Sequence, residues 1–185
     1  MKINACILSL ALWVAGGGVV CATDPPAIWI DVPYVQQTKE GCGSAAISMV
    51  MQYWAKQAGL AASASANVAK IQELLYSREQ NGVPATSMED YFRKQGYETH
   101  AFRGDWGDLE TDIAKGRPLI VCLKSSGQRG PLHYVVVVGI DPTRGYVFLN
   151  DPAMGKLLRI SREGFESEWK LANNWTLLAV PSGKG

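Results

Sequence analysis

The sequence predicts an α+β domain in which an N-terminal helical part packs on a C-terminal antiparallel β-sheet. Up to Gly116, apolar residues recur at the three- and four-residue spacing that is typical of helices. After Pro118 the pattern changes to short apolar runs separated by turn residues, which is typical of strands. Helices that precede a set of sequential strands favour an α+β arrangement of two packed layers.

The expected helices of the first part begin and end at recognisable signals. An extended segment, Trp29–Val35, precedes them. Ser65 is a potential N-cap for the second helix, and Thr86 with Glu89 forms a capping-box pattern at the start of the third. The expected helices are Gly43–Ala58, Ser65–Gly82, Thr86–Gly96 and Asp105–Gly116.

The second part is expected to form five strands. Residues 141–145 form a turn between two of them, and a small helix, Arg162–Trp169, capped by Ser161, interrupts the last pair. The expected strands are Leu119–Leu123, His133–Ile140, Tyr146–Asn150, Lys156–Ile160 and Trp175–Val180.

Length and composition fit one globular domain. The chain has 185 residues, of which 47% are hydrophobic and 19% charged, so it can bury a core and does not resemble a disordered chain. The formal net charge is +1. Because no strong basic field surrounds such a chain, we expect neither nucleic-acid binding nor attraction to anionic lipid. We expect a monomer.

Residues 1–22 differ in composition from the rest and read as a signal peptide. Lys2 gives a short positive start, an apolar run from Ile7 to Val20 follows, and small residues end the segment at Ala22. We expect cleavage after Ala22, a single domain over residues 23–185, and a periplasmic or extracellular location. The alternatives are a retained membrane anchor and lipidation at Cys21.

Cys42 is the strongest candidate nucleophile. It stands between Gly41 and Gly43 at the expected start of a helix, where free N–H groups and the positive helix end favour a thiolate. The alternative is a cysteine that merely packs among small residues. Cys122 lies in an apolar run and reads as a core residue, although a Cys42–Cys122 disulfide would remove the nucleophile.

His133 is the candidate base and Asp151 the candidate orienter. His133 opens a strand, so its side chain can face a cleft at the end of the sheet. Asp151 closes the next strand and can accept a hydrogen bond from Nδ1 of the imidazole, which would fix the tautomer. Asn150 is the rival orienter, and because adjacent strand residues face opposite sides, only one of the two can reach His133.

Gln36 is the candidate donor to an oxyanion. It precedes Cys42 by six residues, and its side-chain amide can act together with the backbone N–H of Cys42. Gln37 is the near competitor.

These residues occur in stretches that resemble the C39 and C39-like peptidase family of papain-like cysteine peptidases. The resemblance covers nearly the whole chain after residue 22 and rests on the order Gln, Cys, His, Asp and on the spacing from Gln36 to Cys42. It implies a papain-like fold, a Cys42–His133–Asp151 triad, Gln36 in the oxyanion hole, and peptide hydrolysis without a metal or other cofactor. The stretches are Val32–Gln36, Gly41–Val50, His133–Asp141 and Asn150–Ala153.

The resemblance also bears on partners and substrate. Gly41 stands where transporter-borne members usually carry Asp, which favours the broader C39-like group, and we expect no ATP-dependent partner. The expected partner is a peptide or protein, with cleavage after Gly-Gly leader sequences as one candidate activity. Alternatives are a cell-wall peptide amidase, a transglutaminase-like acyl transferase and a non-catalytic peptide-binding domain.

Overall fold

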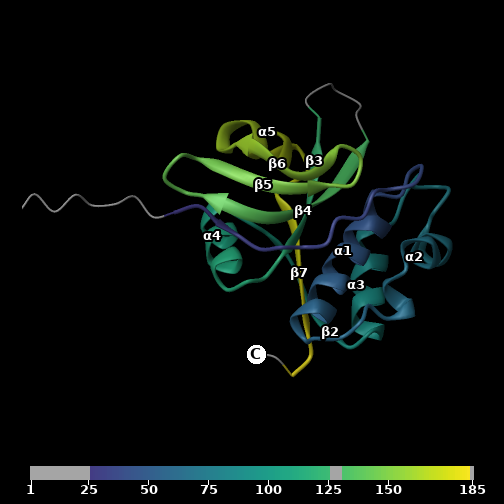
Figure 1. Cartoon of the computed structure of the whole chain (residues 1–185). Helices are drawn as coiled ribbons and strands as arrows, with labels where there is room; N and C mark the ends of the chain where they lie inside the picture. Colours follow the sequence, from purple (N-terminus) through teal and green to yellow (C-terminus); the bar gives the residue numbers. More distant parts are fainter. Residues whose placement is uncertain (1–25, 126–130, 184–185) are drawn as a thin grey trace, which may run out of the picture.

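The computed structural model describes residues 26–125 and 131–183 (Figure 1). The expected signal peptide, its cleavage after Ala22 and the alternatives at Cys21 all fall outside these residues. None of the helices in the described ranges combines the length and the apolar run that a membrane span requires.

An antiparallel seven-stranded sheet forms the centre of the molecule. The strand order is β2-β7-β3-β4-β5-β6, and β1 pairs with β4 outside this path. All five expected strands are present, each within one residue of its expected start and end. The strands are β1 (Ile28–Trp29), β2 (Tyr97–Arg103), β3 (Leu119–Lys124), β4 (Leu132–Asp141), β5 (Tyr146–Asp151), β6 (Gly155–Ser161) and β7 (Trp175–Pro181).

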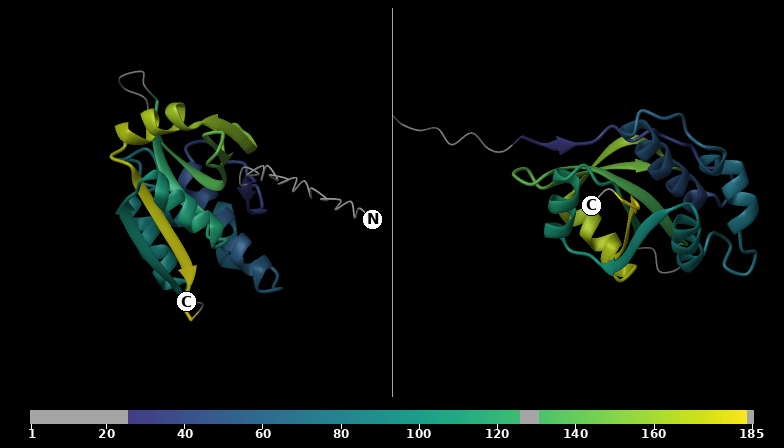
Figure 2. Two further views of the ribbon diagram at one scale, coloured as in Figure 1. Left: turned by 90° about the vertical axis from the view of Figure 1, so that its left-hand side faces the viewer. Right: turned by 90° about the horizontal axis from the view of Figure 1, so that it is seen from below.

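The helices cover both faces of this sheet, so the expectation of two packed layers was wrong. On one face, α1 (Cys42–Gln57), α2 (Val68–Leu75) and α3 (Ala85–Lys94) enclose a core with β3 and β4. On the other face, α4 (Trp106–Ala114) and α5 (Arg162–Leu171) enclose a second core. Figures 1 and 2 show the first three helices grouped together and α4 and α5 apart from them. The unbroken burial of β3 and β4 follows, because a sheet covered on both faces exposes no polar side.

Two of the expected helix starts are confirmed and two are wrong. Asp105 caps α4 through a reciprocal capping box with Asp108, and the Ser161 hydroxyl accepts a hydrogen bond at the start of α5. The cap of α2 is Asn67 rather than Ser65, and this helix ends at Leu75, well before the expected Gly82. At α3 the N-cap is Pro84 and no side chain caps the helix.

The α+β class is confirmed, and two strands lie outside the five expected ones: the short β1, at the start of the expected extended segment, and β2. Residues 97–103 form β2, an edge strand that pairs with β7 alone. No residue of β2 is fully buried, so its sequence carries only a weak apolar alternation.

Candidate active site

Cys42 is the first residue of α1, one position earlier than the expected start of this helix. The N-cap residue, Gly41, has no side chain that could cap the first N–H groups, and the first turn contains no acidic residue. The positive end of the helix is therefore available to a negative charge on the Cys42 sulfur or next to it. Cys42 is partly buried, and both it and the buried Cys122 are free thiols, so the alternative disulfide is absent.

His133 lies near the start of β4 and contacts the carboxylate at the end of β5. The Nε2 atom of His133 is 2.8 Å from Oδ1 of Asp151. The backbone N–H of Ala153 donates to the same oxygen at 2.8 Å, so the carboxylate is held from the turn that follows β5. The contact is made by Nε2 rather than by the predicted Nδ1 atom. Nδ1 is thus the nitrogen that remains for Cys42.

Asn150, the rival orienter, has a different position. Its side chain is buried, its amide Nδ2 donates to the carbonyl of Val32 at 3.1 Å, and its Oδ1 accepts from the backbone N–H of Leu157 at 3.0 Å. Asn150 therefore joins the segment before α1 to the sheet, while Asp151 contacts the imidazole.

The electrostatics of the site favour a protonated His133. Burial of the imidazole opposes its charge, but hydrogen bonds and charge interactions with Asp151 and Cys42 outweigh burial and raise the pKa of His133 to about 9. For Asp151, burial opposes ionisation, yet the hydrogen bond and charge of His133 dominate and lower the pKa of the carboxyl. Burial raises the pKa of Cys122 to about 12, so this second thiol stays protonated. Asp151 and His133 can thus exist together as carboxylate and imidazolium.

A cavity of about 240 Å³ is lined by Cys42 and His133 together with Gln37, and not by Gln36. Its walls are residues 80–83 and 131–134 together with Gln37, Glu40 and Cys42. Gln36 is exposed and lies outside the walls, so the structure does not bring this predicted donor together with Cys42 and His133. The backbone N–H of Gln37 donates to the carbonyl of Pro152 at 3.0 Å, and its buried Oε1 has no hydrogen-bond partner among the described residues. The hydrogen bond from the Gln37 backbone to Pro152 distinguishes the two glutamines. No sequence pattern reveals such a bond.

A family model described as the Peptidase_C39 like family matches residues 29–176. The chain belongs to this family. No curated protein matches the chain significantly.

Solved structures of C39 peptidase domains match the C39-like chain in fold, which establishes the expected papain-like architecture. The peptidase domain of Streptococcus ComA, a bifunctional ABC transporter involved in a quorum-sensing pathway, is 27% identical, with a TM-score of 0.63, 82% of this chain covered and 100% of that one. A putative C39-like peptidase from Bacillus anthracis is 16% identical, with a TM-score of 0.67 and coverage of 86% and 100%. A double glycine motif protease from an AMS/PCAT transporter, solved with its leader peptide, is 21% identical, with a TM-score of 0.63 and coverage of 83% and 94%.

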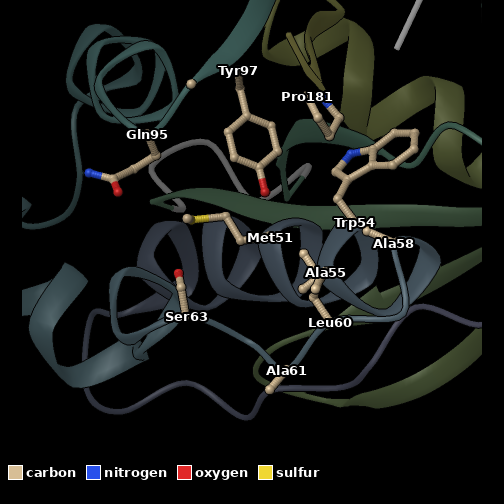
Figure 3. A pocket seen from close by; sticks show the side chains of 11 residues that line it. Met51, Trp54, Ala55, Ala58, Leu60, Ala61, Ser63, Gln95, Tyr97 and Pro181 are labelled. Atoms are coloured by element: carbon tan, nitrogen blue, oxygen red, sulfur yellow. The ribbon is translucent and has the colours of Figure 1, made fainter. Parts of the chain in front are cut away.

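A larger cavity of the C39-like chain, of about 350 Å³, lies along the second half of α1 and lacks reactive groups (Figure 3). Met51, Trp54 and Tyr97 contribute to its mainly apolar walls, which contain no Cys, His or charged side chain. The candidate chemistry therefore belongs to the smaller cavity. Within the described residues, no group of three or more His, Cys, Asp or Glu side chains is placed to hold a metal ion.

Proposed function

We propose that this C39-like protein is a cysteine peptidase that hydrolyses peptide bonds with Cys42 as nucleophile, His133 as acid and base, and Asp151 as the residue that orients His133. The observation that carries the proposal is the placement of Cys42 at the uncapped start of α1, in one cavity with an imidazole that is hydrogen-bonded to a carboxylate. This arrangement fits nucleophilic catalysis, in which a base activates the nucleophile and a third group orients the base.

In the acylation step, the Cys42 thiolate attacks the carbonyl carbon of the scissile bond and a carbon–sulfur bond forms. The protonated His133 then donates its proton to the leaving nitrogen as the carbon–nitrogen bond breaks. The raised pKa of His133, about 9, keeps this proton available at neutral pH.

The negative charge that develops on the carbonyl oxygen is stabilised in this proposal by hydrogen bonds from Gln37 and from the backbone N–H of Cys42. The side chain of Gln37 lines the cavity with Cys42, and the first N–H groups of α1 receive no side-chain cap. Donors preorganised around a developing oxyanion typically contribute ~10²–10³-fold to the rate.

In the deacylation step, neutral His133 takes a proton from water, and the resulting hydroxide attacks the thioester. The carbon–sulfur bond breaks, and Cys42 leaves as a thiolate that again pairs with the protonated imidazole. Every proton in this cycle passes through His133, so no metal or other cofactor is required.

The substrate in this proposal is a peptide or protein, and leader peptides with a double-glycine motif are one candidate class. Support comes from the structural likeness to a double glycine motif protease in complex with its leader peptide. We place the reaction outside the cytoplasm, because residues 1–22 have the composition of a signal peptide.

The test is peptide hydrolysis by the purified protein and its Cys42→Ala variant. Wild-type protein is expected to cleave peptides, and the variant, which retains the fold because a small residue fits the helix start, is expected to show no turnover. Cleavage by Cys42→Ala at the wild-type rate would refute the nucleophile assignment. Release of products from muropeptides alone would indicate a cell-wall amidase, and transfer to an added amine in place of hydrolysis would indicate an acyl transferase.

A further inference from the structure

Glu40 places a carboxyl group in the wall of the reactive cavity. Besides Cys42, His133 and Tyr134, Glu40 is the one titratable side chain in the described walls of this cavity. No lysine or arginine of the described residues forms an ion pair with it. A partly buried carboxylate beside a reactive thiol has a cost, because like charges disfavour the thiolate. None of the proposed reaction steps uses the Glu40 carboxylate, so its position in the cavity points to another role.

The backbone around Glu40 is held in an uncommon conformation. Glu40 has a φ angle of 55°, and Asn81, which also lines the cavity, has a φ angle of 50°. Nδ2 of Asn81 donates to Oε2 of Glu40 at 3.1 Å, and the Tyr76 hydroxyl donates to Oδ1 of Asn81 at 3.0 Å. Left-handed conformations of residues other than glycine are uncommon and concentrate at functional sites.

This chain of hydrogen bonds fixes one carboxylate oxygen of Glu40 and leaves acceptor positions for a ligand. An ionised carboxylate can accept about four hydrogen bonds on its two oxygens. The bond from Asn81 uses one position on Oε2, so Oε1 is available to a donor that enters the cavity.

The position of Glu40 limits which part of a substrate it can bind. Glu40 precedes Cys42 by two residues, so the two Cα atoms are at most ~7 Å apart. A group bound by Glu40 thus belongs to a residue at or next to the bond that Cys42 attacks. The cavity, at about 240 Å³, is smaller than typical sites for drug-sized ligands, which are ~300–1,000 Å³, and suits a single side chain.

We propose that Glu40 is a specificity residue that binds a cationic group, the ammonium or guanidinium of a substrate residue adjacent to the scissile bond. A charge-assisted hydrogen bond of this kind selects against neutral analogues of the same shape. The proposal rests on the proposed peptidase function and names the substrate class of that site. It differs from cleavage after a Gly-Gly pair, because the selected residue carries a positive charge.

The experiment measures selectivity with matched peptides that differ at the residue whose carbonyl is attacked. The pairs are arginine against citrulline and lysine against norleucine, each with a free or an acetylated N-terminus. Wild-type protein is expected to prefer the charged member by ~10-fold or more in kcat/KM. Glu40→Gln is expected to bring both ratios close to one. Asn81→Gly, which preserves the left-handed backbone and removes the orienting amide, is expected to lower them in part.

Glu79→Gln is the matched control, because Glu79 is an exposed acid in the segment that contains Asn81 and lies outside the cavity. It should retain the wild-type ratios. A preference that is abolished by acetylation and is independent of the side chain would assign the cation to the substrate N-terminus. Equal rates within both pairs in wild-type protein, or ratios that Glu40→Gln leaves unchanged, would overturn the proposal.

Binding separates this proposal from the proposed catalysis. Cys42→Ala protein is titrated with the same fluorescently labelled peptides, and anisotropy is measured at low salt. Tighter binding of the charged peptides, lost on adding Glu40→Gln, supports the cation site even if no peptide is cleaved by wild-type protein. Peptide cleavage without any charge selectivity in binding or turnover refutes the cation site and leaves the peptidase proposal intact.

Discussion

At the scale of single residues, His133 connects the other two reactive groups through its two nitrogen atoms. Nε2 contacts Asp151 at 2.8 Å, which leaves Nδ1 for the Cys42 side chain. Asp151 in turn is fixed by the backbone N–H groups of Ala153 and Met154. Because the carboxylate is held by the main chain, the orientation of the imidazole does not depend on any mobile side chain.

The two neighbouring glutamines give a sharp prediction at this scale. Gln37→Ala is expected to lower kcat by ~10²-fold or more, because a donor to the oxyanion is lost. Gln36→Ala, the matched control, should remain close to wild type, since Gln36 is exposed and outside the cavity. Steady-state kinetics on one peptide would decide the matter. The opposite ranking of the two variants would return the role to Gln36.

The residues of the site illustrate what the sequence can and cannot supply. Cys42, His133 and Asp151 were predicted from helix and strand ends, because regular elements determine where their terminal residues lie. Gln36 was chosen over Gln37 on spacing alone, and in an irregular loop spacing does not determine which side chain turns inward. Glu40 and Asn81 were not among the predicted site residues, since their left-handed backbone is a product of the folded loops.

At the scale of elements, the start of α1 is packed directly against the cavity wall. A Cβ atom added at Gly43 would lie 2.8 Å from Cβ of Val83 and 2.8 Å from Cε of Met88. Val83 is itself a wall residue of the cavity. The glycine after Cys42 therefore lets α1 approach residues 80–83 closely enough to form a narrow cavity.

Gly43→Ala is expected to destabilise the protein and to reduce its activity. Overpacking of this kind typically costs ~1–3 kcal/mol, against a helix-propensity gain of ~1 kcal/mol. Gly82→Ala is the stability control, since its added Cβ would meet no atom closer than 3.9 Å. Thermal or urea unfolding of both variants tests this. A Gly43→Ala protein that is more stable than wild type would show that the wall moves freely.

Prediction of the elements succeeded where the local signal was strong. The Asp105 cap of α4 agrees with a reciprocal hydrogen-bond pair that sequence rules describe well. The Thr86–Glu89 pattern failed at α3 because Glu89 pairs with Arg93 at 2.6 Å, inside the helix, and the chain enters α3 through Pro84. Strand β2 was missed because an edge strand with polar side chains lacks the apolar pattern of the central strands.

At the scale of the whole molecule, the sheet carries His133 and Asp151, Cys42 comes from α1, and helices cover both faces of the sheet. The sequence indicates that the sheet is covered on both faces, because β3 and β4 are nearly continuous apolar runs. Such runs are typical of strands buried on both sides. The expectation of two layers was based on the order of helices and strands along the chain. Element order does not say on which face a late helix such as α5 packs.

The charged pair at the end of the sheet predicts how global stability depends on pH. His133 has its pKa raised from 6.5 to about 9, so its contribution is fully present below pH 6.5 and is lost as the pH rises through about 9. The loss amounts to roughly 3 kcal/mol at most. Asp151, with a lowered pKa, contributes stability above its ordinary pKa of 3.8 that is lost in acid.

Urea unfolding at several pH values measures this dependence. Wild-type stability should fall between pH 6.5 and 9, and His133→Ala should show a much flatter profile in that range. Parallel profiles for the two proteins would mean that His133 is not protonated in the folded state.

The most direct test of the central claim, that Cys42 is paired with His133 as a reactive thiolate, is the rate of alkylation by iodoacetamide as a function of pH, with the modified residue mapped by mass spectrometry. Buried Cys122, with its pKa raised to about 12, serves as the internal control. The account predicts rapid modification of Cys42 below pH 8, where an ordinary thiol with a pKa of about 8.5 is mostly protonated, and a loss of this reactivity in His133→Ala. A Cys42 rate that rises only above about pH 8.5, and that His133→Ala leaves unchanged, would contradict it.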